Sequence, residues 1–297
     1  MKYLLNDNRY LNFSVGNYHQ FIATFQDDYN PNILDQWIAV DNSVSPAKSS
    51  QIVLGYEEYI KDLYKIQVEG YYKDIRNLFT FEESRATTDE AISDSVLSDI
   101  VTPSDGYAYG LELFAQKMSG RLSGWLAYTF SVSRKSMNSI FYEKEEEYFN
   151  SWDRTHSFSA LGNYIFNKKW DMNWKLSLQS GQAYTPIIGY YNQILPEGPD
   201  EVYRTIPGTR NSARYSPYSR LDLGIVYHTK LFGSKMDIYV QVINVLNRKN
   251  IFRNIFVEKY FSRKQIENCF RKNICLSLIH ISEPTRPERI SAGGVGV

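Results

Sequence analysis

The chain has 297 residues, and its 33 basic and 33 acidic side chains give a formal net charge of zero. This balance suggests neither nucleic acid nor a strongly charged protein as a partner. The two cysteines, Cys269 and Cys275, lie close together near the C-terminus, so we expect neither a disulfide scaffold nor a cysteine-based zinc site. No run of about 18 apolar residues is present, and we therefore expect no transmembrane helix.

The N-terminal residues do not form a signal peptide, because residues 1–5 (MKYLL) lead directly into the polar residues 6–9 (NDNR). From there, apolar and polar residues alternate in many segments, which indicates strands with two different faces. In 122–134, for example, Leu126, Tyr128 and Phe130 alternate with smaller or more polar residues. The pattern predicts nine long strands, at 10–24, 49–60, 63–78, 106–118, 122–134, 155–167, 170–183, 217–230 and 234–247.

The connections between these strands alternate in length. Short turns are expected at 6–9, 60–62, 119–120, 167–169 and 231–234, and long polar loops at 25–48, 79–105, 135–154 and 184–216. Alternating short turns and long loops are typical of an up-and-down barrel in the outer membrane. Tyr and Trp residues near many strand ends suit the headgroup boundary. The predicted fold is all-β, a transmembrane antiparallel up-and-down β-barrel. Because such bacterial barrels have even strand numbers, nine strands also indicate a partial barrel that is incomplete at both ends.

The C-terminal region breaks the pattern. Residues 276–286 (LSLIHISEPTR) resemble the translation of a sequencing adaptor, and 262–275 also lose the alternation that precedes them. We therefore expect a partial barrel over 1–261 and an aberrant tail over 262–297, which we exclude from fold reasoning from residue 276 onward. The alternative is a genuine disordered tail.

Several segments, in this order and on alternating strands, resemble the C-terminal barrel of TonB-dependent outer-membrane receptors, particularly Bacteroidetes-like ones. They are 11–20 (LNFSVGNYHQ), 54–58 (LGYEE), 68–73 (VEGYYK), 106–114 (GYAYGLELF), 124–129 (GWLAYT), 152–158 (WDRTHSF), 218–224 (YSRLDLG) and 242–250 (VINVLNRKN). The resemblance implies about nine or ten strands of a barrel of about 22. It also implies location in the outer membrane, with membrane lipid, a plug domain, TonB and a small-molecule or oligomeric nutrient as partners.

Few residues invite a chemical role. Asp153 and Arg154 are expected to pair where a long loop enters a strand, and a catalytic use with His156 and Ser157 is the weaker reading because no nucleophile motif surrounds them. Arg220 and Asp222 lie two apart and hence on one face, which we expect to be the hydrated lumen. There they either pair with neighbours or the plug, or are simply solvated.

Trp37, Tyr190 and Tyr191 lie in predicted long loops, where they either stack on a ligand or pack within the loop. The four scattered histidines have no metal-ligand spacing. We predict no catalytic, cofactor-binding or metal-binding residues, no cofactor, and no enzyme activity. The leading functional hypothesis is TonB-dependent uptake of a scarce nutrient (siderophore, vitamin, glycan or peptide). The alternatives are a passive porin-like or adhesin-like barrel without a plug, and a soluble all-β binding or hydrolytic protein.

Overall fold

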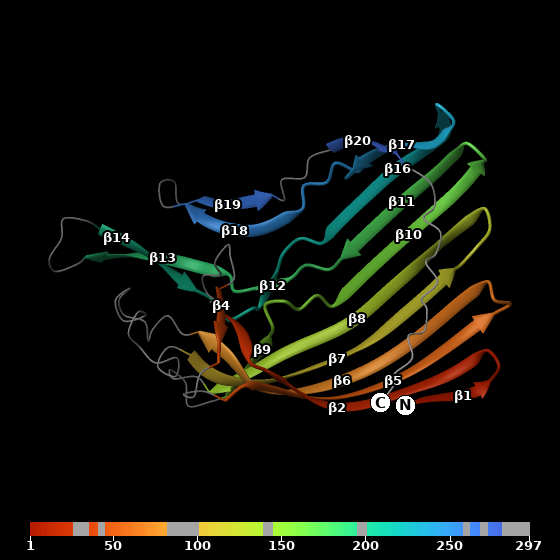
Figure 1. Ribbon diagram of the computed structural model, residues 1–297. Helices are drawn as coiled ribbons and strands as arrows, with labels where there is room; N and C mark the ends of the chain where they lie inside the picture. Colours follow the sequence, from red (N-terminus) through yellow and green to blue (C-terminus); the bar gives the residue numbers. More distant parts are fainter. Residues whose placement is uncertain are drawn as a thin grey trace, which may run out of the picture.

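The computed structural model of the chain describes residues 1–25, 36–40, 45–81, 101–138, 145–194, 201–257, 262–267 and 273–280. All its regular elements are strands, most of them in one large antiparallel sheet (Figure 1). Among the described residues, no helix is long and apolar enough to cross a membrane. The architecture is therefore all-β, as the alternating sequence pattern predicts.

The main sheet has 12 strands, and neighbours in the sheet mostly follow one another along the chain. Strand β9 pairs with β8 beside this path. The strands are, in sheet order, β1 (Lys2–Asn6), β2 (Arg9–Gln20), β5 (Ala47–Ile60), β6 (Tyr64–Phe81), β7 (Val101–Lys117), β8 (Leu122–Asn138), β10 (His156–Asn167), β11 (Trp170–Gln179), β16 (Tyr218–Leu231), β17 (Ser234–Ile243) and β20 (Asn273–His280), with β9 (Glu145–Phe149) at the side.

Four small two-stranded sheets are built from the longer connections and from the C-terminal region. They are β3 (Ile22–Phe25) with β4 (Gln36–Ala39), β12 (Ala183–Tyr184) with β15 (Ala213–Arg214), β13 (Ile187–Ile194) with β14 (Glu201–Pro207), and β18 (Ile251–Val257) with β19 (Ser262–Glu267). Figure 1 shows β13, β14, β18 and β19 extending past the main sheet on the side opposite the tight turns.

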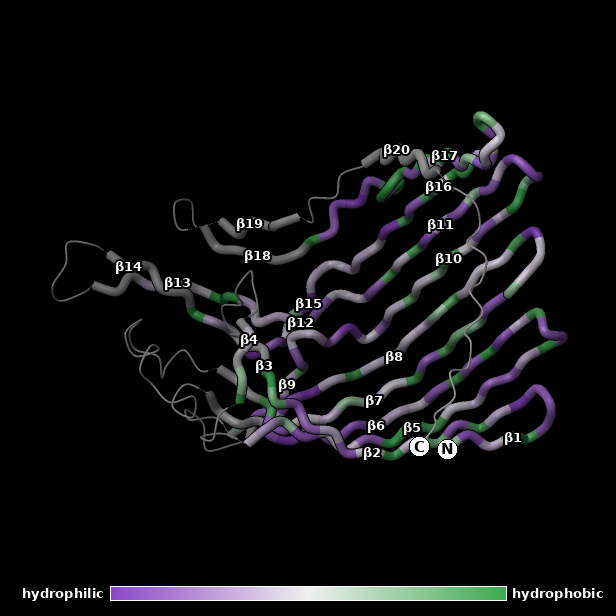
Figure 2. Tube along the Cα trace, viewed as in Figure 1, coloured by the Kyte–Doolittle hydropathy of each residue, from purple (hydrophilic) through white to green (hydrophobic). Residues whose placement is uncertain are grey.

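The two faces of the main sheet differ in character, as the tube in Figure 2 indicates by its alternating colours. Side chains on the apolar face remain exposed, because no second layer of the described structure covers them: Leu54, Ile66, Tyr72, Leu126, Ile225 and Val240. The buried hydrophobic residues of the described part are Met137, Tyr148, Ala160 and Ala183. The described part of the sheet has no ordinary core, and an extended apolar face of this kind is typical of a surface that contacts a membrane or another protein.

Two-residue turns join several strand pairs. Phe232 and Gly233 connect β16 to β17, both with positive φ (51° and 81°), and Leu231 pairs with Ser234. The connection from β5 to β6 has three residues, 61–63, of which Lys61 and Asp62 each have φ 51°. Two successive positive φ values define the type I′ geometry, whose twist matches that of the flanking strands. These turns fix the hairpin register.

Each of the nine predicted strands overlaps a strand of the main sheet, with bounds that differ by a few residues in most cases. The prediction of one strand over 10–24 was wrong, because β2 ends at Gln20 and β3 pairs with β4 instead of continuing along β5. The predicted long loops also contain strands: β4, β9, β13, β14 and β15 lie within them, and β6 and β7 extend into one from both sides.

The region beyond residue 261 contains two strands where the sequence predicts none. Strand β19 pairs with β18, and β20 continues the main sheet by pairing with β17 from Met236↔His280 to Ile243↔Asn273. In β20, Ile274, Leu276 and Leu278 recur every second residue, a period that suits a strand. The boundary at 261 and the adaptor-like origin of 276–286 stay predictions.

Candidate functional site: the polar face and the loop junction at its rim

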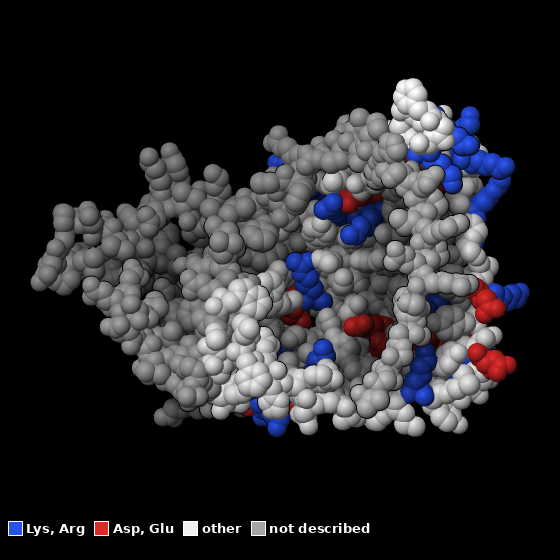
Figure 3. All heavy atoms as spheres, in the orientation of Figure 1, with Lys and Arg blue, Asp and Glu red and all other residues white. Residues whose placement is uncertain are grey.

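The polar face of the main sheet carries most of its charged side chains. Figure 3 looks onto a hollowed side of the molecule in which basic and acidic atoms gather. Register places the following charged residues on this one face: Glu57, Lys65, Glu69, Lys73, Glu112, Lys175, Arg220 and Asp222. Glu57 is 6% exposed, and Lys2 and Lys65 bring their ammonium groups to 3.3 and 3.8 Å from its carboxylate. Charge pairing makes this burial tolerable.

Arg220 and Asp222 form a bidentate contact on this face. The Nε atom of Arg220 donates to both carboxylate oxygens of Asp222 at 2.8 and 3.0 Å, and Nη2 lies 2.8 Å from Oδ2. The backbone N–H of Asn244 also donates to Asp222 at 2.8 Å, where β17 has ended. The predicted shared face of Arg220 and Asp222 therefore holds an ion pair that also caps the end of β17.

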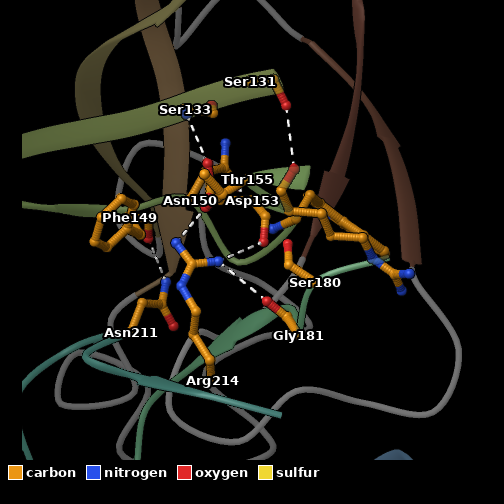
Figure 4. Close-up of polar contacts among 12 residues, drawn as sticks. Ser131, Ser133, Phe149, Asn150, Asp153, Thr155, Ser180, Gly181, Asn211 and Arg214 are labelled. Carbon is orange, nitrogen blue, oxygen red and sulfur yellow. Dashed lines mark hydrogen bonds and ion pairs between the residues drawn. The ribbon is translucent and has the colours of Figure 1, made fainter. Parts of the chain in front are cut away.

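At the rim, the buried carboxylate of Asp153 joins two connections (Figure 4). Asp153 is 3% exposed and accepts hydrogen bonds from the backbone N–H of Ser133 (2.7 Å) and from Nη2 of Arg214 (2.6 Å). Arg214 also donates to the backbone oxygen of Gly181 (3.1 Å), and its guanidinium lies 4.7 Å from the ring centre of Phe149. One ion pair thus ties the β9–β10 connection to β15.

The expected pairing of Asp153 with Arg154 was wrong. Arg154 donates instead to the side-chain oxygens of Gln179 and Gln182, the latter at 3.2 Å. Asp153 and Arg154 therefore contact different neighbours. Because Arg154 is partly removed from water and its partners are neutral amides, its pKa is lowered from the ordinary arginine value.

Asn211 and Arg210 extend the junction beyond Asp153. Asn211 is buried; its amide donates to the backbone oxygen of Phe149 (2.8 Å), and its backbone N–H donates to Oγ1 of Thr185 (3.1 Å). Arg210 is also buried, with its guanidinium 4.9 Å from the ring centre of Tyr148. We call Asp153, Arg214, Asn211, Thr185, Arg210 and Tyr148 the rim junction.

Sequence reasoning missed most of the rim junction. It singled out Asp153 but none of Arg210, Asn211 and Arg214. These three residues lie in a segment predicted to be a long loop, and Arg214 is 61 positions from Asp153. No local spacing connects residues so far apart. The one sequence feature that could have drawn attention to these three residues is the short polar segment 209–214 (TRNSAR) in which they lie.

The aromatic ligand candidates lie on separate hairpins. Trp37 is in β4, opposite Thr24 of β3, whereas Tyr190 and Tyr191 are in β13, opposite Thr205 and Arg204 of β14. All three rings are exposed. Tyr190 and Tyr191 are consecutive in a strand and so face opposite sides, which prevents both from stacking on one side of a ligand. Their role in ligand binding stays a prediction.

The residues of the weaker catalytic reading do not converge. His156 Nδ1 lies 2.9 Å from the hydroxyl of Tyr128, and its ring lies against Phe130. Ser157 follows His156 in β10 and therefore faces the other side of the sheet. Across the described ranges, no group of three or more His, Cys, Asp or Glu could hold a metal ion.

Comparisons with known proteins place this geometry among outer-membrane barrels. No family model and no curated protein matches the sequence. Solved structures do match, and each match below covers 93% of this chain. The pyoverdine outer membrane receptor FpvA of Pseudomonas aeruginosa has a TM-score of 0.55 and 14% identity over 34% of its own length. The ferric preacinetobactin receptor BauA of Acinetobacter baumannii has a TM-score of 0.52 and 10% identity over 35% of its length, and the FrpB iron transporter of Neisseria meningitidis has a TM-score of 0.51 and 13% identity over 37% of its length.

These similarities define the class of fold. The chain is an all-β, antiparallel, partial barrel of the outer-membrane type, and it spans about a third of the length of the solved structures it matches. In the described part, the two ends of the sheet order, β1 and β20, are not paired with each other. At 10–14% identity the likeness concerns the fold.

Proposed function

We propose that this chain forms part of the barrel wall of a TonB-dependent receptor in the outer membrane, which imports a scarce nutrient. The supporting observation is a long antiparallel sheet with one exposed apolar face and one face of paired charges, with tight turns at one edge and large connections at the other. In lipid every backbone polar group must be paired, and a closed wall of strands meets this requirement. The apolar face then contacts lipid and the polar face lines the lumen.

This orientation gives the two ends of the barrel different roles. The tight turns point to the periplasm and the long connections to the outside, where the rim junction holds two of them in place. In this proposal, nutrient binds at the outer connections and at a plug inside the barrel, and TonB pulls on the plug to open a path. Because the solved neighbours include receptors for iron-carrying ligands, a ferric chelate is the first ligand to test.

The experiment that tests the receptor proposal is recovery and expression of the complete gene. We expect a plug domain and a TonB-binding segment to precede the barrel, and the product to fractionate with the outer membrane. Growth on a ferric chelate that depends on both this gene and TonB would support uptake. A complete gene without a plug domain would instead indicate the passive porin-like barrel, and a product in the soluble fraction would contradict both.

A further inference from the structure

Basic side chains at the turn edge of the sheet lie on its polar face. Lys230 and Lys235 are direct cross-strand partners next to the β16–β17 turn. Lys230 and His228 are each an even number of residues from Asp222 in β16, so they share its polar face. Lys169 lies opposite His228, whose backbone N–H donates to the Lys169 oxygen at 2.8 Å. Three lysines of two neighbouring hairpins therefore face the proposed lumen, at a corner where Figure 3 shows basic atoms gathered.

The β7–β8 turn adds one inward charge and keeps another on the opposite face. The backbone N–H of Ile165 donates to the oxygen of Arg121 at 2.8 Å, which extends the β8–β10 register by one pair. Arg121 is two residues before Ser123, which the register places on the polar face. Lys117 lies on the apolar face, where its Nζ atom is 5.9 Å from the ring centre of Tyr64. The inward basic residues, which we call the basic arc, are Arg121, Lys169, Lys230 and Lys235.

The charges of the basic arc are not balanced within the described part of the chain. All four side chains are exposed, and none of them belongs to an ion pair between described residues. Two carboxylates on the same face, Asp171 and Asp237, lie 2.9 and 2.7 Å from the two ring nitrogens of His228 and are engaged there. Lys230 and Lys235 also repel each other, because they are like charges in direct cross-strand positions. An anionic partner would therefore stabilise this edge.

The remaining tight turns do not share this excess of positive charge. The β1–β2 turn contains Asp7 with Arg9 beside it, and the β5–β6 turn contains Lys61 with Asp62. The basic arc is therefore confined to one part of the turn edge, from β8 to β17. A localised charge of this kind suits a specific contact, whereas a general need for solubility would spread the charge around the edge.

The width of the basic arc fits an extended peptide. Arg121 immediately precedes β8 and Lys235 is in β17, with β10, β11 and β16 between them in the sheet. Four strand spacings of about 4.8 Å make about 19 Å, which is the length of about six extended residues. One phosphate or carboxylate group cannot contact charges so far apart, whereas a segment with several Asp or Glu residues can.

Deeper on the same face, the sheet carries a row of side chains that suits a peptide backbone. The register places in one row across five strands Ser123, Asn163, Asn173, Gly224 and Gln241. A side-chain amide both donates and accepts hydrogen bonds, and the groups of a peptide backbone do the same. Amides beside clustered cations favour an acidic polypeptide over a simple anion as the partner.

We infer that the basic arc binds an acidic segment of the polypeptide that precedes the barrel in the complete gene product. The inference rests on the proposed function, which puts a plug of the same gene product inside the lumen. This chain spans about a third of the length of the solved structures it matches, which leaves ample sequence for such a segment. Covalent linkage gives that segment a higher effective concentration at the arc than a separate protein has. Because the arc lies on the polar face, lipid headgroups are not its occupant.

The test is cross-linking of the complete gene product in detergent micelles with a carbodiimide, which joins lysine amines to carboxylates in direct contact. Mass spectrometry should find Lys169, Lys230 and Lys235 linked to Asp or Glu residues of one segment that precedes the barrel. Lys117, on the opposite face, is the internal control and should give no link to that segment. Cross-links in intact cells that join the arc to a separate protein instead would overturn the inference in favour of an external acidic partner.

Substitutions measure what the charges contribute. Lys230→Gln/Lys235→Gln should speed protease cleavage of the linked segment about two- to fivefold for each lysine removed, and high salt should speed it in the unchanged protein. Lys230→Arg/Lys235→Arg keeps the charge and should keep the protection. The matched control Lys48→Gln/Lys61→Gln removes the same charge elsewhere and should leave the cleavage rate unchanged. Equal cleavage rates in the two Gln variants would overturn the inference.

The outcomes separate the two proposals. A complete gene without a plug domain contradicts the proposed function, and this inference with it. A plug domain that has no acidic segment, or that links equally to Lys117 and to the lysines of the basic arc, overturns this inference alone. Electrophoresis with and without boiling shows whether each variant has closed its barrel, so that a loss of cross-links is assigned to the charges and not to misfolding.

Discussion

Asp153 receives both the guanidinium of Arg214 and the backbone N–H of Ser133, and it is almost fully buried. Replacing it with Ala leaves both donors without their acceptor. Breaking a buried pair by removing one partner is costly, although Arg214 keeps part of its exposure to water. We expect Asp153→Ala to lower the free energy of unfolding of the complete gene product by roughly 2–4 kcal/mol, measured by urea unfolding in detergent micelles, and to increase protease cleavage of the outer connections.

A surface ion pair provides the control for Asp153. Asp74 contacts Arg76 at 3.0 Å, but both side chains are largely exposed. Pairs of this kind add little to stability because water and salt screen them. Asp74→Ala should leave unfolding and protease cleavage unchanged. If the two substitutions had equal effects, Asp153 would be no more than another surface charge.

For single residues, the sequence predicted contacts correctly where the two partners are close together along the chain. Arg220 and Asp222 are two residues apart in a strand, so the period of two placed them on one face, and the structure pairs them there. Arg214 is 61 positions from Asp153, and Gln179 and Gln182 are 25 and 28 positions from Arg154. Only the folded path of the connections brings these groups together, and no local pattern encodes that path.

At the scale of paired strands, packing on the apolar face depends on glycine positions that leave room for a large side chain on the neighbouring strand. Gly162 of β10 is opposite Trp174 of β11, and a Cβ atom at Gly162 would lie 2.4–2.5 Å from the indole ring. Gly162→Ala must therefore move the ring of Trp174, at a cost of about 1–3 kcal/mol in unfolding free energy. Urea unfolding followed by tryptophan fluorescence measures both the stability and the change at the ring.

Gly189 in β13 is the matched position. A Cβ atom there meets Ile206 at 3.4 Å, which is ordinary contact. Alanine loses less backbone entropy than glycine on folding, so Gly189→Ala should be neutral or slightly stabilising. A destabilisation equal to that of Gly162→Ala would show that the indole contact is not the cause.

In the β16–β17 turn, by contrast, we expect a substitution to increase stability. Phe232 adopts φ 51°, a region that costs an L-residue with a bulky side chain roughly 1–2 kcal/mol and that Asn enters more easily. Since the ring is 98% exposed, its removal loses no packing. Phe232→Asn should raise the unfolding free energy by about 1 kcal/mol, whereas Phe232→Ala, with its unfavourable φ, should bring no such gain. A gain from Ala equal to that from Asn would contradict this explanation.

Sequence periodicity found the long strands but not the short ones. A strand of the main sheet has ten or more alternating residues in most cases, whereas β12 and β15 have two each and β3 and β4 four each. Such short segments acquire their strand conformation from a partner across a long connection, as Ala183 does from Arg214. Tertiary pairing overrides weak local preference here, which explains why the predicted loops contained hairpins.

At the scale of the whole molecule, the backbone of the two outermost strands limits what this chain can do alone. The sheet order runs from β1 to β20, and each end presents a row of backbone N–H and C=O groups. In lipid each unpaired group costs several kcal/mol, so a wall with two free edges is not a stable membrane structure. We therefore expect this chain by itself to form no stable monomeric barrel, whereas the complete gene product should form one.

Electrophoresis with and without boiling measures this difference directly. A closed outer-membrane barrel resists detergent and migrates as a compact band until it is boiled, because no edge offers a place for unfolding to begin. The chain refolded in micelles should give one band at the same position with or without boiling, and the complete gene product should shift on boiling. A compact band of this chain that unfolds only on boiling would mean that β1 and β20 close on each other, or on a second copy, and would remove the need for further strands.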